Sequence, residues 1–64
     1  MIQKMSAIRK ARGLTQDELS RISGVPRITI ARYETGRVDP TMANAKKLAD
    51  ALGVKIDDLI GKGA

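Results

Sequence analysis

The middle of the sequence holds side chains that could read a nucleic acid. In a helix over residues 27–34, Ile30 and Tyr33 would lie on one side, because successive residues turn by about 100°. Ile28 and Arg32 would lie on the opposite side. A guanidinium can donate to guanine or bind a phosphate, and an aliphatic side chain can pack against a thymine methyl. We therefore interpret Arg32 and Ile28 as base contacts, and Ile30 and Tyr33 as core.

Two short helices joined by a tight turn must position these side chains. Thr15 and Glu18 have the spacing of a capping box, which predicts that a helix runs from Thr15 to Ser23. Gly24 can take the positive φ that ends this helix, and Pro26 suits the first turn of the next one. The stretch 16–35 is therefore interpreted as a helix-turn-helix, whose second helix commonly enters the major groove of DNA.

Residues around the second helix add possible DNA contacts. Arg27 can reach a base or a phosphate, and Ala31 lies on the same outward side as Ile28. Gln16 would follow the cap of its helix, where backbone N–H groups and the helix dipole favour a phosphate. The loop 35–37 offers backbone N–H groups and the Arg37 side chain to a phosphate. The predicted DNA contacts are Gln16, Arg27, Ile28, Thr29, Arg32, Thr35 and Arg37.

Three more helices are expected around the helix-turn-helix. A first helix over residues 1–12 would end at Gly13, and a fourth would begin at its N-cap Thr41 and end at Gly53. A short last helix is expected over residues 54–60, followed by a frayed tail at 61–64. The apolar side chains expected to face inward are Met1, Met5, Ile8, Leu14, Leu19, Ile22, Ile30, Tyr33, Met42, Ala45, Leu48, Ala49, Leu52 and Leu59.

The ordered set of motifs resembles a known family. The segments IRKARGLTQDEL, SGVPRITIARYETGR and DPTMANAKKLADALGVKIDDLI follow one another with the spacing of the Cro/CI-type (XRE-like) helix-turn-helix domains. The resemblance implies an all-α, five-helix, lambda-repressor-like fold in a single domain 1–64, with the core match at 8–60. The chain departs from the family pattern at four positions, which are Ser20, Ser23, Pro26 and Lys55.

The resemblance also implies contacts that the spacing alone does not. It implies that Arg9 pairs with Glu34 at the end of the third helix. It implies a transcriptional regulator, a repressor, that binds double-stranded DNA as a homodimer on a palindromic operator. The expected partner surface is the exposed part of the last helix, around Val54, Ile56 and Ile60.

Composition excludes several classes of site. The 64 residues contain no Cys and no His, which excludes disulfides, zinc fingers and Cys/His catalysis. We therefore expect no metal, no cofactor and no small-molecule ligand. With one Tyr and no Phe or Trp, the core must be aliphatic. The lack of Cys favours a cytoplasmic protein, and the resemblance implies a nucleoid-associated one encoded by a bacterium or a phage. No apolar run reaches the ~18 residues of a membrane helix, so we expect no membrane partner.

The net charge of +5 is confined to the half that carries the helix-turn-helix. Residues 1–37 hold eight basic and three acidic side chains, giving +5, whereas residues 38–64 hold four of each, giving zero. A basic half can simply keep a protein in solution, but its coincidence with the motif favours attraction to phosphates.

Two other functions remain open from the sequence. A protein-binding module such as an antitoxin could use the same fold and still bind DNA, although the chain has no extra segment suited to wrapping a partner. An enzyme is disfavoured, because the seven carboxylates are scattered and no nucleophile has a base beside it.

Overall fold

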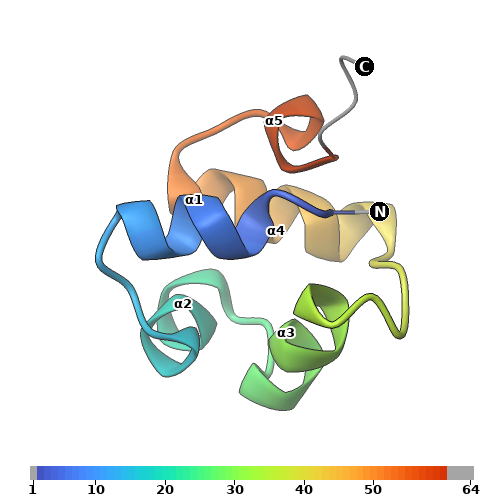
Figure 1. Cartoon of the computed structure of the whole chain (residues 1–64), viewed down its shortest axis with the longest axis horizontal. Coiled ribbons are helices and arrows are strands. Elements are labelled where there is room, and N and C mark those ends of the chain that lie inside the picture. The colour runs from blue at the N-terminus through green and yellow to red at the C-terminus, as the bar shows by residue number, and fades with distance from the viewer. Residues whose placement is uncertain (1, 61–64) are drawn as a thin grey trace.

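The computed structural model describes residues 2–60, which form five α-helices and no strand (Figure 1). The predicted all-α, five-helix architecture is confirmed over these residues. Met1, expected in the apolar stripe of the first helix, and the expected frayed tail 61–64 lie outside the described residues. The helices are α1 (Met5–Ala11), α2 (Gln16–Ser23), α3 (Arg27–Glu34), α4 (Met42–Leu52) and α5 (Ile56–Ile60).

The capping signals around α2 operate as predicted. The Thr15 hydroxyl accepts from the Glu18 N–H at 3.0 Å, and the Glu18 carboxylate accepts from the Thr15 N–H at 2.8 Å. The hydrogen bond from the Thr15 backbone to the carboxylate, and after it the Thr15 side chain, lower the pKa of Glu18. Gly24 ends the helix in the left-handed region with φ of 80°. Pro26 takes the N-cap position of α3 and lies just before its first turn.

The start of α1 differs from the prediction. The helix begins at Met5, because Ile2 is buried and the Lys4 N–H donates to the Leu59 carbonyl of α5 at 3.0 Å. Residues 2–4 therefore form a turn that ties the beginning of the chain to α5. Apolar periodicity along residues 1–12 could not reveal this tertiary hydrogen bond.

α4 begins and ends as predicted, but α5 begins later. The Thr41 hydroxyl accepts from the Asn44 N–H at 3.1 Å, and Gly53 ends α4 with φ of 71°. Val54, expected in the last helix, donates its N–H to the Ala49 carbonyl at 3.0 Å and so belongs to the cap of α4. α5 starts at Ile56, after Lys55, whose N–H donates to the Asp58 carboxylate at 3.1 Å.

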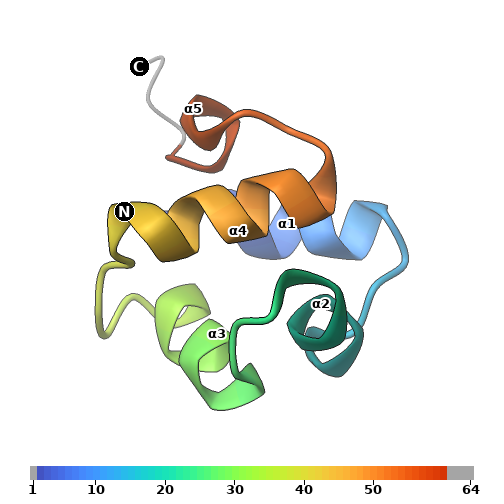
Figure 2. The same cartoon turned by 180° about the vertical axis from the view of Figure 1, so that it is seen from behind.

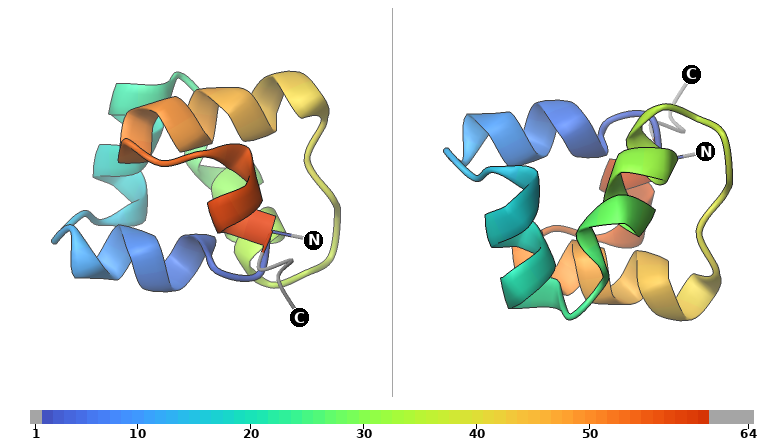
Figure 3. Two further views of the ribbon diagram at one scale, coloured as in Figure 1. Left: turned by 90° about the horizontal axis from the view of Figure 1, so that it is seen from above. Right: turned by 90° about the horizontal axis from the view of Figure 1, so that it is seen from below.

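The helices lie at three levels, with α1 and α4 in the middle (Figure 1). α1 and α4 run across the middle, with α5 over one side and α2 and α3 over the other (Figures 1 and 2). The views from above and below agree with this arrangement. α5 lies in front in the view from above, and α2 and α3 lie in front in the view from below (Figure 3). α2 packs against α3 and α4, whereas α5 packs against α1 and α4. α3 is thus left with an open outward face.

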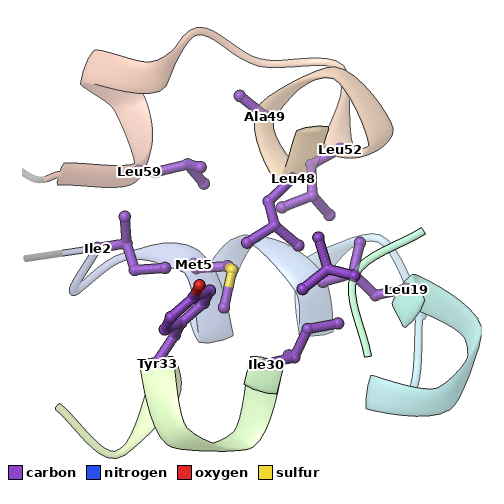
Figure 4. Close-up of a cluster of buried hydrophobic side chains, with 10 residues drawn as sticks. Ile2, Met5, Leu19, Ile30, Tyr33, Leu48, Ala49, Leu52 and Leu59 are labelled. Atoms are coloured by element: carbon purple, nitrogen blue, oxygen red, sulfur yellow. The ribbon is translucent and has the colours of Figure 1, made fainter. Parts of the chain in front are cut away.

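An aliphatic core with one tyrosine joins all five helices (Figure 4). Tyr33 is buried, and its hydroxyl accepts from the Asn44 amide at 2.8 Å, so its polar end is satisfied. Ile8 and Leu14 are partly buried against this core. The buried apolar side chains are Ile2, Met5, Leu19, Val25, Ile30, Tyr33, Ala45, Leu48, Ala49, Leu52 and Leu59.

Two side chains predicted to face inward are exposed instead. Ile22 is 58% exposed, because the inward arc of α2 is formed by Leu19 together with the half-buried Ser20 and Ser23, and Ile22 is rotated away from it. Met42 is 70% exposed at the first position of α4, whereas the buried residues of this helix begin at Ala45. Both predictions were wrong.

A buried ion pair links α1 to the end of α3. The Arg9 Nε donates to Glu34 Oε2 at 2.8 Å, and its Nη2 donates to Oε1 at 3.2 Å. The two side chains are only 9% and 8% exposed. Arg9 Nη1 also donates to the Leu14 carbonyl at 2.7 Å, and the Gln16 amide donates to Glu34 Oε1 at 3.0 Å. The expected pair is present, and Gln16 extends it to the start of α2.

Burial and hydrogen bonding act on Glu34 in opposite directions. Burial raises the pKa of Glu34, but the hydrogen bonds from Arg9 and Gln16 and the positive charge of Arg9 outweigh it, so the pKa lies below its ordinary value of 4.5. The carboxylate therefore remains ionised at neutral pH. The folded state stabilises this ionised form more than the unfolded chain does.

Removal of Arg9 should cost much more than removal of an exposed arginine. Arg9→Ala leaves the Glu34 carboxylate buried without its charge partner, and we expect a loss of ~3–5 kcal/mol in the free energy of unfolding. The control is Arg21→Ala, which breaks an exposed pair with Asp17 at 2.9 Å and should cost ~0–1 kcal/mol. Urea unfolding measures both. A loss below ~0.5 kcal/mol for Arg9→Ala would rule out a stabilising buried pair.

Acidification should weaken the fold through Glu34. Because its pKa is lower in the folded state, this carboxylate contributes stability above its unfolded pKa, and the contribution is lost as the pH falls below about 4.5. Thermal melts of the wild type and Glu34→Gln between pH 7 and pH 3 measure the effect. The difference between the two melting temperatures should shrink as the pH falls, and a constant difference would contradict this expectation.

Candidate nucleic-acid interface

α3 has one buried and one exposed side, as predicted. Ile30 and Tyr33 are 0% and 7% exposed, whereas Ile28 is 57% exposed. Arg27 and Arg32 are also exposed. An eight-residue helix thus uses its inner side to attach to the core and presents a mixed basic and apolar outer side.

In the part of the chain that the structure describes, the arginines on and after α3 have no carboxylate partner. Within residues 2–60, no ion pair involves Arg27, Arg32 or Arg37, whereas Arg9 and Arg21 are both paired. Three exposed guanidiniums without internal partners produce a positive potential beside the outer side of α3. Each has five N–H donors in a planar fork that matches a phosphate or the edge of a guanine.

The loop after α3 uses its backbone donors internally. The Gly36 N–H donates to the Tyr33 carbonyl and the Arg37 N–H to the Arg32 carbonyl, both at 3.1 Å. The Thr35 hydroxyl donates to the same Arg32 carbonyl at 2.9 Å. The expectation that these backbone N–H groups meet a phosphate is therefore wrong, because they already complete the end of the helix. The Arg37 side chain is still exposed.

Gln16 lies at the first position of α2, as predicted, but its side chain already has a protein partner. It is half-buried, and its amide donates to Glu34 Oε1 at 3.0 Å. This contact brings the start of α2 next to the end of α3. Thr29 is also half-buried, in contrast to the exposed Ile28 before it.

A concavity lies beside the outer side of α3. Its volume is about 240 Å³. Ala31, which the sequence placed outward but without an assigned contact, is half-buried in this concavity. Ala31 follows Ile28 by three residues and directly precedes Arg32. This helical spacing could have identified it as a neighbour of both on the outward side. The lining residues are Ile28, Ala31, Arg32, Thr35 and Arg37.

The residues predicted for a dimer contact lie elsewhere. Val54, Ile56 and Ile60 are half-buried and pack against the core, so each keeps part of its apolar surface exposed. They belong to α5 and the turn before it, across the α1–α4 layer from α2 and α3 (Figure 1). A partner bound there would leave α3 uncovered. A hollow of about 370 Å³ at this end is lined by Lys46, Ala49, Asp50, Val54, Lys55, Ile56 and Asp57.

Among residues 2–60, no group of three or more Cys, His, Asp or Glu side chains could hold a metal ion. Over the same residues, no helix is long and apolar enough to cross a membrane.

Comparison with known proteins agrees with this geometry. A family model described as helix-turn-helix matches residues 5–59. An HTH-type transcriptional regulator of Methanocaldococcus jannaschii is 41% identical over 59 residues, which cover 92% of this chain and 89% of the relative. No solved structure shows a significant match.

Two phage repressors are also similar. A cryptic phage CTXphi transcriptional repressor of Vibrio cholerae is 37% identical over 62 residues, covering 97% of this chain and 55% of the relative. The immunity repressor protein of Bacillus phage phi105 is 33% identical over 60 residues, covering 94% and 42%. The chain thus spans about half the length of these repressors. The match to the family model and the similarity to the regulator from Methanocaldococcus jannaschii show that the chain belongs to the Cro/CI-type (XRE-like) family of helix-turn-helix DNA-binding domains.

Proposed function

We propose that this chain is a sequence-specific transcriptional regulator, a repressor, that places α3 in the major groove of its operator. The observation that carries the proposal is the outer side of α3, where Ile28, Arg27 and Arg32 are exposed and neither arginine forms an ion pair within residues 2–60. The confinement of the net charge to residues 1–37 supports the same face. The names of the two phage relatives support repression.

The contacts divide into readers of bases and binders of phosphate. Arg32 can donate two hydrogen bonds to a guanine, and Ile28 can pack against a thymine methyl. Arg27, at the start of α3, can reach a base edge or the backbone. Arg37 lies in the loop beyond the helix, where a phosphate is the expected partner.

Gln16 and the two threonines complete the proposed interface. The Gln16 amide donates to Glu34, which orients the side chain at the start of α2, a position suited to a phosphate. Thr35 uses its hydroxyl proton within the protein, so toward DNA it can only accept a hydrogen bond or make an apolar contact. Thr29 is half-buried and has the smallest reach of the set.

The protein would act as a homodimer. One short recognition helix reads few base pairs, so useful specificity requires two copies on half-sites about 10 bp apart. The proposed interface is formed by Val54, Ile56 and Ile60, which are half-buried. They belong to α5 and the turn before it, and α5 lies on the other side of α1 and α4 from α3 (Figure 1). The operator would then be palindromic, because a two-fold axis relates the two copies of α3. A cytoplasmic location follows from this proposal, since the operator is there.

Loss of Arg32 and loss of Arg37 should have different effects on DNA binding. Arg32→Ala should weaken binding to the best operator by ~1–3 kcal/mol and flatten the base preference at one position in each half-site. Arg37→Ala should weaken all sequences alike and reduce the salt slope by about one ion per subunit, since each neutralised phosphate releases about one counterion.

The measurement is one set of titrations over several salt concentrations, on an operator and its single-base variants. Ile28→Ala is the uncharged comparison, and it should weaken the preference for thymine without changing the salt slope. If Arg32→Ala weakened every sequence equally while Arg37→Ala changed the base preference, the two roles would be wrongly assigned.

Dimer formation should make stability depend on concentration. If two copies bury the remaining surface of Val54, Ile56 and Ile60, the melting temperature should rise with protein concentration. Sedimentation equilibrium, with and without operator DNA, checks the assembly directly. A monomer at high concentration in both conditions would eliminate the proposed dimer.

A further inference from the structure

A side-chain hydrogen bond crosses the short turn that joins α2 to α3 (Figure 2). Ser23 is the last residue of α2, and its hydroxyl oxygen accepts from the Val25 N–H at 3.1 Å. We propose that Ser23 is a positioning residue, which holds the first turn of α3 and so places Arg27 and Ile28 for contact with DNA. This inference rests on the proposed function and adds to it a residue of α2 that does not itself touch DNA.

The start of α3 has no other side-chain hydrogen bond to hold it. Pro26 occupies the N-cap position, where it makes no side-chain capping bond and has no N–H to donate. Within the described part of the chain, the side chains of residues 24–29 form no hydrogen bond. The Ile30 N–H donates to the Pro26 carbonyl at 3.0 Å, so the first turn of the helix depends on where the preceding turn leaves Pro26.

The Val25 N–H needs the Ser23 hydroxyl because the turn is buried at this point. Val25 is only 1% exposed, and a buried donor without an acceptor is costly. The neighbouring Gly24 N–H is already bonded to the Ser20 carbonyl at 2.9 Å. Without the hydroxyl, the Val25 N–H can be satisfied only if the turn opens toward water. Because Pro26 follows directly, such a movement would displace the start of α3.

The end of α3 is held by a different set of contacts. Glu34 accepts from Arg9 at 2.8 Å and from Gln16 at 3.0 Å. Arg32 lies in the last turn of α3, next to this network. Loss of the Ser23 hydroxyl should therefore disturb the contacts made from the first turn of the helix and spare the contact made by Arg32.

Amide hydrogen exchange on the free protein tests the positioning without DNA. The reference is the Thr35 N–H, which donates to the Ala31 carbonyl at the end of α3. In Ser23→Ala, exchange at Val25 and Ile30 should accelerate about fivefold relative to Thr35, the ratio for one hydrogen bond.

Two further variants assign this change to the hydroxyl. Ser23→Thr keeps the hydroxyl and should restore the wild-type exchange ratio. The matched control is Ser20→Ala, which changes another half-buried serine of α2 whose side chain forms no hydrogen bond within residues 2–60. This control should leave the exchange ratio unchanged.

Binding to a duplex selected from random-sequence DNA tests the consequence for function. Ser23→Ala should weaken binding to that duplex about fivefold per subunit, and Ser23→Thr should restore it. The salt slope should not change, because no charge is removed. In double-mutant cycles, the loss should couple with that of Ile28→Ala and simply multiply with that of Arg32→Ala.

Failure of this inference can be distinguished from failure of the proposed function. If Ser23→Ala accelerates all three amides equally, the hydroxyl supports the fold as a whole and the inference is overturned. Coupling with Arg32→Ala in place of Ile28→Ala would also overturn it, and the regulator proposal would stand. If the protein enriches no sequence, the proposed function fails, and the exchange ratio still decides whether Ser23 positions the start of α3.

Discussion

The buried pair of Arg9 and Glu34 is the contact on which the position of the recognition helix depends. Glu34 is the last residue of α3, and its carboxylate accepts from Arg9 of α1 and from Gln16 of α2. One carboxylate thus joins three helices at the point where α3 ends. Because every buried charge here has hydrogen-bond partners, the desolvation that normally penalises such groups is largely offset. This network therefore fixes the position of the side chains that face outward from α3.

The short recognition helix packs against the core on one side and faces solvent on the other. Ile30 and Tyr33 hold it to the interior, and Tyr33 also accepts from Asn44 of α4. Ile28 lies on the outward side and does not pack in the core, so the stability of the isolated chain does not explain an apolar residue at this position. An exposed Ile costs little in water, but it adds apolar surface where a base edge would lie. The composition of α3 therefore agrees better with a binding surface than with a stable, solvated helix.

Local rules predicted the helix boundaries where local chemistry controls them. Thr15 with Glu18, Gly24, Thr41 and Gly53 occupy the caps that the sequence indicated. The same rules failed at the start of α1, where a residue distant in the sequence determines the helix boundary. No pattern in residues 1–12 reveals that the Lys4 N–H donates to the Leu59 carbonyl.

Side-chain burial was predicted less well than helix position, for a geometric reason. The apolar residues Ile22 and Met42 matched helical spacing, but the direction of the inward arc depends on which helices lie opposite. The Arg9–Glu34 pair spans 25 residues, and it was expected from family resemblance, since spacing along the chain does not indicate it. Ile28 and Arg32 were identified correctly as exposed, because the positions of Ile30 and Tyr33 leave only one arrangement of the helix, whereas Ala31, which was also placed outward, is half-buried.

α3 and α5 lie on opposite sides of α1 and α4 (Figure 1), so the surface proposed to read DNA is separate from the surface proposed for the dimer. Labelling the protein with ¹⁵N and titrating it with a selected duplex tests this account most directly. Amide shifts should concentrate on the start of α2, the outer side of α3 and residues 35–37. Shifts confined to α5 and the end of α4, with α3 unchanged, would contradict the account.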